Sequence, residues 1–201
     1  MSHIVITGGG TGVGAEIAHA VAATGAKVTI MGRREAPLRE QGLPFQTCDV
    51  TDPEAVQAAF AAARAENGPI TGVVANAGAA HSAPFHKITA QDITDMMAVN
   101  VTGVFNVWQA ALAEMKEAGQ GRLIAVASTA GLKGYPYVAG YVAAKHGVVG
   151  LTRALALELE PVARGAAHAR RQAQPAAHPA HGSGRSDGRD LPGARAVPGE
   201  R

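Results

Sequence analysis

A tyrosine, a lysine and a serine are spaced in this chain so that together they could transfer a proton. Tyr141 and Lys145 stand four residues apart, so on a helix they share one face. A nearby ammonium favours the phenolate of a tyrosine. Ser128, at the end of an apolar run, could bind the same substrate oxygen. Such a trio suits proton transfer at oxygen with hydride transfer at the adjacent carbon. Because this spacing more often marks an ordinary surface pair, the chemistry requires a hydride carrier elsewhere in the chain.

A glycine-rich loop near the N-terminus indicates such a carrier. The apolar run 3–6 predicts a short buried strand, and it is followed by Thr7-Gly-Gly-Gly-Thr-Gly-Val-Gly14 and by a helical pattern that Gly25 should end. A glycine loop between a strand and a helix N-terminus lets the backbone approach a pyrophosphate. Such loops are also ordinary tight turns, but the next apolar run, 27–31, completes a strand–loop–helix–strand unit and favours nucleotide binding.

Two arginines follow the second predicted strand, where the adenosine ribose of a dinucleotide would lie. The sequence there is Gly32-Arg33-Arg34. An acidic residue would accept the ribose hydroxyls of NAD, whereas arginine suits the 2′-phosphate of NADP. The sequence therefore favours NADP, with NAD possible. A solvated arginine pair that opens a loop is the alternative interpretation.

The remaining periodic segments alternate between strands and helices. Further strands are expected at 45–48, 70–74 and 123–127, and helices at 53–66, 90–97, 98–118 and 141–160, with Asp52 and Thr89 as N-caps. Asn100 lies in an apolar turn of the third of these helices, where it should bend the helix or hydrogen-bond elsewhere. The pattern predicts an α/β fold, a doubly wound parallel sheet in a Rossmann-like three-layer αβα arrangement. Ligands bind beyond the carboxyl ends of such strands.

Composition narrows the function classes. The 201 residues are 47% hydrophobic with a single cysteine, Cys48, and no signal peptide or membrane span is visible, so a cytoplasmic protein is expected. Residues 162–201 carry seven Arg against three acidic residues, so the net charge of +2 leaves −2 on residues 1–161. The basic character therefore belongs to the tail and predicts neither a nucleic-acid partner nor a membrane partner.

With these residues assembled, the chain resembles the short-chain dehydrogenase/reductase family. Thr7-Gly8-x-x-x-Gly12-Val13-Gly14 matches the cofactor loop of that family, Asp49-Val50 its adenine-contacting pair, and Asn76-Ala77-Gly78 its Asn-Ala-Gly turn. The catalytic tetrad is matched, in order and in spacing, by Asn100, Ser128, Tyr141 and Lys145.

The resemblance implies an NAD(P)-dependent oxidoreductase that acts on a secondary alcohol or ketone, and the phrases around Ser128 and Tyr141 look most like 3-oxoacyl-thioester reductases and hydroxyacyl dehydrogenases. Tyr141 would be the acid/base, Ser128 would polarise the substrate oxygen, and Asn100 would hold a relay water. Lys145 would favour the Tyr141 phenolate and bind the nicotinamide ribose. The implied cofactor-binding residues are Thr7, Gly8, Gly12, Val13, Gly14, Arg33, Asp49, Val50, Asn76, Ala77, Gly78, Tyr141 and Lys145. A homo-oligomer is also implied, and no metal.

The resemblance stops near residue 160. The family would continue with further strands, whereas residues 162–201 contain ten Ala, seven Arg, six Gly, four Pro and three His. This composition predicts a disordered, low-complexity tail behind an incomplete catalytic domain at 1–161, with the last strands missing. It suggests a second hypothesis, a catalytically impaired nucleotide-binding protein from a frameshifted or truncated reductase gene. A sugar-nucleotide epimerase or dehydratase is a third, disfavoured because no sugar domain follows.

Overall fold

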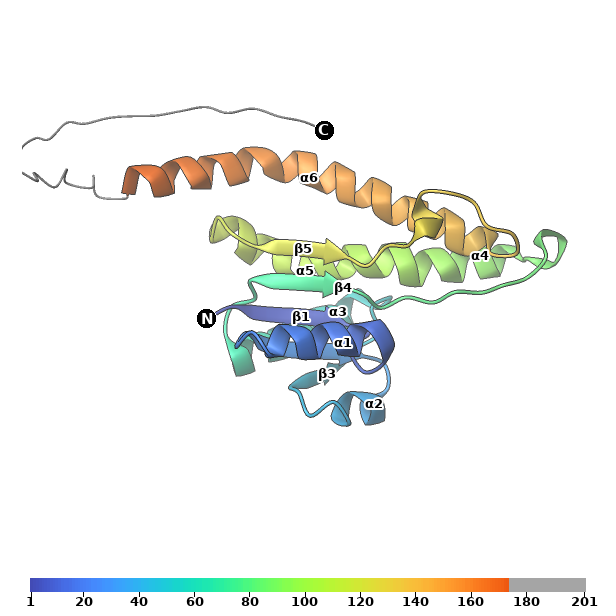
Figure 1. Ribbon diagram of the computed structural model, residues 1–201, viewed down its shortest axis with the longest axis horizontal. Coiled ribbons are helices and arrows are strands. Elements are labelled where there is room, and N and C mark those ends of the chain that lie inside the picture. The colour runs from blue at the N-terminus through green and yellow to red at the C-terminus, as the bar shows by residue number, and fades with distance from the viewer. Residues whose placement is uncertain (174–201) are drawn as a thin grey trace, which may run out of the picture.

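One parallel sheet of five strands organises the molecule (Figure 1). The computed structural model describes the backbone of residues 1–173 and the side chains of residues 1–159. The strand order is β3-β2-β1-β4-β5, and the strands are β1 His3–Thr7, β2 Lys27–Gly32, β3 Phe45–Thr47, β4 Gly72–Ala75 and β5 Arg122–Ala125. The predicted doubly wound parallel sheet is confirmed. Each predicted strand is present, within two residues of its expected start.

Helices cover both faces of the sheet. They are α1 Gly12–Ala22, α2 Glu35–Arg39, α3 Pro53–Asn67, α4 Ala90–Met97, α5 Gly103–Glu117 and α6 Ala139–Ala173. Shorter segments are the 3₁₀ turns η1 Phe85–Lys87 and η3 Thr129–Gly131 and the π-helix η2 Ala98–Thr102. Side chains of α3, α5 and α6 pack on one face of the sheet, and side chains of α1 and α2 on the other. These three layers are those predicted.

Alternation along the strands sends successive side chains into different layers. Val5 of β1 and Val73 of β4 lie in the α3/α5/α6 layer, while their neighbours Ile6 and Val74 lie in the α1/α2 layer. All four are buried, as expected for a parallel sheet covered on both faces.

Two predicted N-caps position the helices that follow β3 and β4. The Asp52 carboxylate accepts hydrogen bonds from the backbone N–H groups of Glu54 (2.9 Å) and Ala55 (3.1 Å) at the start of α3. The Thr89 hydroxyl accepts from the N–H of Asp92, whose carboxylate accepts in return from the N–H of Thr89. Both caps satisfy donors that a helix N-terminus leaves unpaired.

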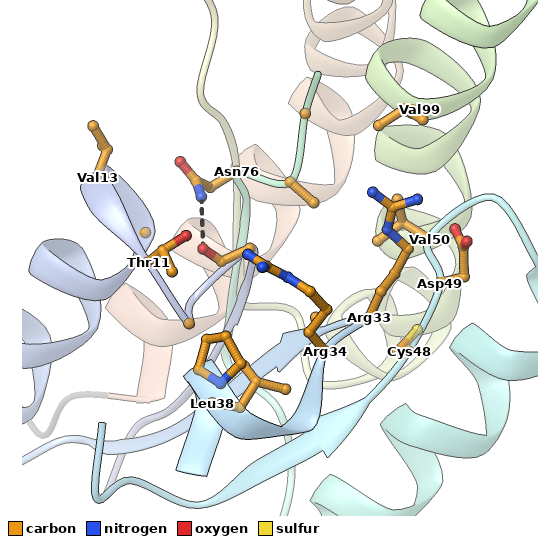
Figure 2. Close-up of a pocket in the computed structure, with 17 residues that line it drawn as sticks. Thr11, Val13, Arg33, Arg34, Leu38, Cys48, Asp49, Val50, Asn76 and Val99 are labelled. Carbon is orange, nitrogen blue, oxygen red and sulfur yellow. Dashed lines mark hydrogen bonds between the residues drawn. The ribbon is translucent and has the colours of Figure 1, made fainter. Parts of the chain in front are cut away.

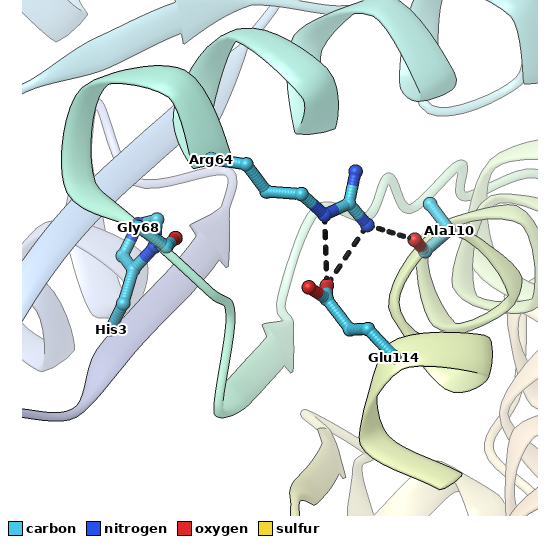
Figure 3. Close-up of polar contacts among 5 residues, drawn as sticks. All are labelled: His3, Arg64, Gly68, Ala110 and Glu114. Atoms are coloured by element: carbon cyan, nitrogen blue, oxygen red, sulfur yellow. Dashed lines mark hydrogen bonds and ion pairs between the residues drawn. The ribbon is translucent and has the colours of Figure 1, made fainter. Parts of the chain in front are cut away.

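An ion pair fastens α3 to α5 at the end of the sheet opposite the glycine loop (Figure 3). Arg64 Nε donates to Glu114 Oε1 over 3.0 Å, and its Nη2 reaches the same oxygen at 2.9 Å and also donates to the carbonyl of Ala110. Nearby, the ring of His3 is buried at the start of β1 and hydrogen-bonds to the carbonyl of Gly68 (2.8 Å) and the hydroxyl of Thr29 (2.9 Å).

The structure departs from the sequence prediction in three places. Helix α2, Glu35–Arg39, was not predicted. The helix expected over 98–118 begins as the π-helix Ala98–Thr102, which contains Asn100. The helix expected to end near Glu160 continues to Ala173. Alanine and arginine are strong helix formers, which explains the continuation. The rest of the predicted tail, 174–201, lies outside the described residues.

One helical stretch, Ala90–Glu117, is long and apolar enough by length and composition to cross a membrane. Half of its most apolar window is buried inside the molecule. Its α5 part supplies core residues against the sheet, including Val104, Val107 and Trp108. These contacts are typical of a core helix.

Candidate active site

The backbone of the glycine loop, which joins β1 to α1, is closely packed against β2 and against itself. The N–H groups of Gly8 and Gly9 both donate to the carbonyl of Met31 in β2, over 2.7 and 3.2 Å. A Cβ added at Gly14 would lie 2.2 Å from the carbonyl oxygen of Gly8, closer than any real Cβ contact. The loop therefore requires glycine at position 14, and the backbone reaches the start of α1 uncovered by side chains.

A pocket of about 290 Å³ opens beside this loop at the carboxyl ends of the strands (Figure 2). Nine of the residues predicted to bind a cofactor line it: Gly8, Val13, Gly14, Arg33, Asp49, Val50, Asn76, Ala77 and Gly78. The N-cap residue of α1, Thr11, also lines the pocket and makes no side-chain capping bond, so the first turn of α1 keeps unpaired N–H donors beside it. Positive potential at a helix N-terminus suits an anionic group such as a phosphate.

On the far wall of the pocket, the carboxylate of Asp49 lies near the guanidinium of Arg33. Asp49 Oδ1 accepts from the N–H and the hydroxyl of Thr51, over 2.9 and 2.8 Å. These hydrogen bonds, with a smaller contribution from the charge of Arg33, hold the pKa of Asp49 below its usual value. Figure 2 shows the Arg33 side chain beside Asp49 and that of Arg34 reaching toward the glycine loop. Two guanidinium groups thus border one end of the pocket.

The Asn76 side chain links the end of β4 to the glycine loop by hydrogen bonds. Its Nδ2 donates to the carbonyl of Thr7 (3.0 Å) and to that of Gly8 (3.3 Å, dashed in Figure 2). The buried Thr7 hydroxyl accepts in turn from the backbone N–H groups of Asn76 and Ala77, each over 3.1 Å. The sequence grouped Thr7 and Asn76 as cofactor residues, and in the structure the side chain of each hydrogen-bonds to the backbone of the other.

Asn100 is fully buried and bonded to the segment that follows β4. Its Nδ2 donates to the carbonyls of Ala79 (2.9 Å) and Met96 (3.0 Å), and its Oδ1 accepts from the N–H of Ala79 over 3.4 Å. A π-helical turn shifts the backbone partners by one residue, and such turns are frequent at functional sites. The prediction that Asn100 would hydrogen-bond outside its own helical turn is confirmed.

Lys145 is buried, with 5% of its surface exposed, and its Nζ donates to the carbonyl of Val126 just after β5, over 2.9 Å. Burial lowers its pKa from the ordinary lysine value. The same Nζ lies 5.6 Å from the centroid of the Tyr141 ring, so the two side chains share one face of α6 as predicted. A Cβ added at Gly78 would lie 2.8 Å from Asn100 Oδ1 and 3.8 Å from Lys145 Nζ. Gly78, which lines the pocket, therefore lies next to two of the four predicted catalytic residues, Asn100 and Lys145.

Ser128 is brought to α6 by the short turn that it caps. Its hydroxyl oxygen accepts from the N–H of Ala130 over 3.1 Å at the start of η3. Glycine at position 131 lets η3 press onto α6, because a Cβ there would lie 2.7 Å from the carbonyl oxygen of Lys145. Within the described residues, neither the Tyr141 hydroxyl nor the Ser128 hydroxyl donates a hydrogen bond to another protein group, so both are available to a substrate oxygen.

Several pocket residues were missed by the sequence analysis. Leu38 comes from the unpredicted helix α2, Val99 precedes Asn100 in the π-helix, and the remainder are Gly10, Thr11, Gly32, Arg34, Pro37 and Cys48. Burial, together with the charges of Asp49 and Asp52, raises the pKa of the Cys48 thiol to about 11. Gly10 and Thr11 belong to the glycine loop, and Gly32 and Arg34 flank Arg33 in the segment that the sequence placed at the ribose. Pro37, Leu38, Cys48 and Val99 belong to no motif, and only proximity in the fold reveals them.

Comparisons with known proteins identify the family of this chain. The family model for short chain dehydrogenases matches residues 2–163. The 3-oxoacyl-[acyl-carrier-protein] reductase MabA of Mycobacterium bovis is 38% identical over 157 residues, which cover 78% of this chain and 62% of that protein. The acetoacetyl-CoA reductase of Rhizobium meliloti is 37% identical over 159 residues, covering 77% and 66%.

A solved structure shows the same arrangement. The crystal structure of a variant of the actinorhodin polyketide ketoreductase with NADPH superposes with a TM-score of 0.77 at 35% identity, covering 81% of this chain and 66% of that one. This chain therefore spans about two thirds of the length of the relatives it matches. With the family model covering most of its length and a parallel sheet that carries the glycine loop at its centre, this chain belongs to the short-chain dehydrogenase family.

Proposed function

We propose that this chain binds NADP and transfers hydride between it and a ketone or secondary alcohol, with a 3-oxoacyl thioester as the substrate class. The observation that carries the proposal is that Gly78 both lines the glycine-loop pocket and lies next to Asn100 and Lys145, at the carboxyl ends of the strands. A relative named for a 3-oxoacyl-carrier-protein substrate and one named for acetoacetyl-CoA both support the thioester class.

The residues present fit a nicotinamide dinucleotide. Gly14 lets the start of α1 pack closely against the glycine loop beside the pocket, where its first N–H groups can bind a pyrophosphate, and the Asp49 carboxylate is fixed by Thr51 on the far wall. Arg33 and Arg34 supply cations for a 2′-phosphate, which supports NADP over NAD. When bound, the nicotinamide ring would donate or accept hydride.

Tyr141 would exchange the proton at the substrate oxygen, because its hydroxyl is not engaged by another protein group within the described part of the chain. Ser128 would donate a hydrogen bond to the same oxygen. The charge of Lys145, 5.6 Å from the tyrosine ring centroid, favours the phenolate. Asn100 fixes the segment after β4 against which the reacting carbon would lie. We also propose a cytoplasmic protein, oligomeric as the family resemblance implies.

Reduction of acetoacetyl-CoA, followed by loss of NADPH absorbance, tests the proposal, with NADPH binding measured separately by fluorescence. Tyr141→Phe should lower kcat by about 10²- to 10⁴-fold, the usual contribution of general acid–base catalysis, with unchanged NADPH binding. Arg33→Ala should weaken NADPH binding without weakening NADH binding. Equal activity of the wild type and Tyr141→Phe would refute the assigned role.

A second candidate is a nucleotide-binding protein with little turnover. It is favoured by the position of β5, which has no outer neighbour within residues 1–173 and leads directly to Val126 and Ser128. NADPH binding by the wild type without reduction of any 3-oxoacyl thioester would support it. Absence of NADPH binding would refute both candidates.

A further inference from the structure

The turn that follows β3, residues 49–52, forms one wall of the nucleotide pocket, and its own hydrogen bonds are local. Asp49 and Val50 line the pocket. The Asp49 carboxylate accepts from the N–H of Thr51, and the Asp49 carbonyl accepts from the N–H of Asp52 over 3.1 Å. These bonds set the shape of the 49–52 turn, whereas its position relative to the sheet must be fixed by other contacts.

A side chain of α5 attaches this turn to the rest of the molecule. Asn106 Nδ2 donates to the carbonyl of Val50 over 2.9 Å, and both residues are buried, with 9% and 6% of their surfaces exposed. Among the described residues, this is the one hydrogen bond from the 49–52 turn to an element distant in the sequence. Because a buried carbonyl without a partner is costly, the bond holds the turn against α5.

Two further residues on the same face of the η2–α5 helix lie at Val50 or beside it. Gly103, three residues before Asn106, has no side chain, and a Cβ there would lie 2.7 Å from Cγ2 of Val50. Val99, four residues before Gly103, lines the pocket itself (Figure 2). Residues three and four apart share one face of a helix. The face that carries Val99, Gly103 and Asn106 therefore supports the Val50 wall of the pocket.

We propose that Asn106 is a positioning residue for the nucleotide: it does not line the pocket, but through the Val50 carbonyl it holds the pocket wall in place. The inference rests on the proposed NADP function, in which Arg33 binds the 2′-phosphate. Figure 2 shows Arg33 on the same side of the pocket as Asp49 and Val50, so the adenosine end of the cofactor would lie against Val50. Loss of the Asn106 bond should therefore weaken binding of that end and leave hydride transfer in the saturated enzyme unchanged.

Substitution by leucine, which is close to asparagine in shape but donates no hydrogen bond, tests this role. Asn106→Leu should raise the Kd for NADPH about tenfold, and by the same factor the Kd for 2′,5′-ADP, which carries the adenosine end alone. At saturating NADPH, kcat should equal that of the wild type. Val73→Ala is the matched control, because it also removes buried contacts but lies in β4 and does not line the pocket. A merely structural role of Asn106 would lower the urea midpoint of both variants and change neither Kd.

A double-mutant cycle provides a second readout that does not depend on the folding of Asn106→Leu. Gly103→Ala adds a methyl group 2.7 Å from the Val50 side chain and should weaken NADPH binding about fivefold or more. In a Val50→Ala background, which removes that neighbour, the same substitution should have no further effect. The inference is overturned by an unchanged Kd in Asn106→Leu, by a loss that 2′,5′-ADP does not share, by an equal loss in Val73→Ala, or by additive effects in the cycle. Absence of NADPH binding by the wild type would instead refute the proposed function, and this inference with it.

Discussion

Strands β4 and β5 are neighbours of the same length, paired residue for residue from Gly72 with Arg122 to Ala75 with Ala125. All four residues of β4 are buried, whereas those of β5 alternate between exposed and half-buried. Both segments are short and apolar, so their difference in protection comes from position: β4 has a strand on each side, and β5 has one within the described residues. The glycine loop and Asn76 thus follow strands with a neighbour on each side, β1 and β4, whereas Ser128 follows β5, which has one neighbour within the described residues.

The largest expected effect concerns the glycine loop. Gly14→Ala places a Cβ 2.2 Å from the Gly8 carbonyl and should abolish NADPH binding and destabilise the fold by about 3 kcal/mol or more, since the clash is with backbone. Gly150→Ala is the matched control. It meets nothing within 4 Å inside α6 and should stabilise the protein by about 0.5–1 kcal/mol. Urea unfolding and fluorescence titration measure both effects, and normal NADPH binding by Gly14→Ala would contradict the geometry.

The next largest effect concerns the hydrogen bonds between Asn100 and the segment that follows β4. Asn100→Ala leaves the N–H and C=O of Ala79 without their buried partner and should cost about 2–4 kcal/mol in the free energy of unfolding. Asn106→Ala is a comparison in the next helix, because Asn106 is also buried but makes a single bond, to the carbonyl of Val50. It should cost about 1 kcal/mol. Equal losses in the two variants would mean that the Ala79 contacts add nothing.

The comparison between β4 and β5 can be tested by truncating one side chain in each of these two strands. Val73 of β4 is fully buried, so Val73→Ala should cost about 2 kcal/mol. Ile124→Ala removes more atoms but from a half-exposed site, and it should cost about 1 kcal/mol or less. If Ile124→Ala proves as costly as Val73→Ala, β5 is better protected than the exposure of Ile124 indicates.

The smallest effect lies at the start of β1 and depends on pH. Burial lowers the pKa of His3 below its ordinary value of 6.5, so below that pH the unfolded chain binds a proton that the folded chain does not. Stability is then complete above about pH 6.5 and falls as the pH drops toward the folded pKa, by at most about 1.4 kcal/mol per pH unit. In His3→Gln, urea unfolding between about pH 7.5 and 5.5 should show a smaller loss than in the wild type. In His146→Gln, which alters an exposed histidine, the wild-type loss should persist.

Much of this architecture could be predicted from residue patterns. The strand–glycine loop–helix unit, the caps at Asp52 and Thr89 and the shared face of Tyr141 and Lys145 depend on local rules, and all are present. The role of the Asn76 side chain was less accessible, because its partners Thr7 and Gly8 are 69 and 68 residues away. The same holds for the π-helix at Asn100, which depends on contacts with Ala79.

The end of α6 shows a different limit. A composition rich in alanine and arginine is compatible both with a low-complexity tail and with a helix that continues its predecessor, and sequence alone favoured the first from residue 162. The backbone is helical to Ala173. The prediction that the last strands are missing already implies an unpaired side for the fifth strand. Which of its side chains are exposed could not be predicted, since an apolar run has the same appearance at the centre of a sheet and at its edge.

The hydrogen bond from Lys145 Nζ to the carbonyl of Val126 bears on the proposed catalysis. It anchors the buried ammonium to the backbone immediately after the least protected strand. Release of one edge strand costs less free energy than global unfolding, so it occurs in molecules that are otherwise folded. In that state the lysine loses its acceptor and Ser128 loses its place. The competent fraction of the protein is then smaller than the folded fraction, and apparent activity scales with the time that β5 stays docked.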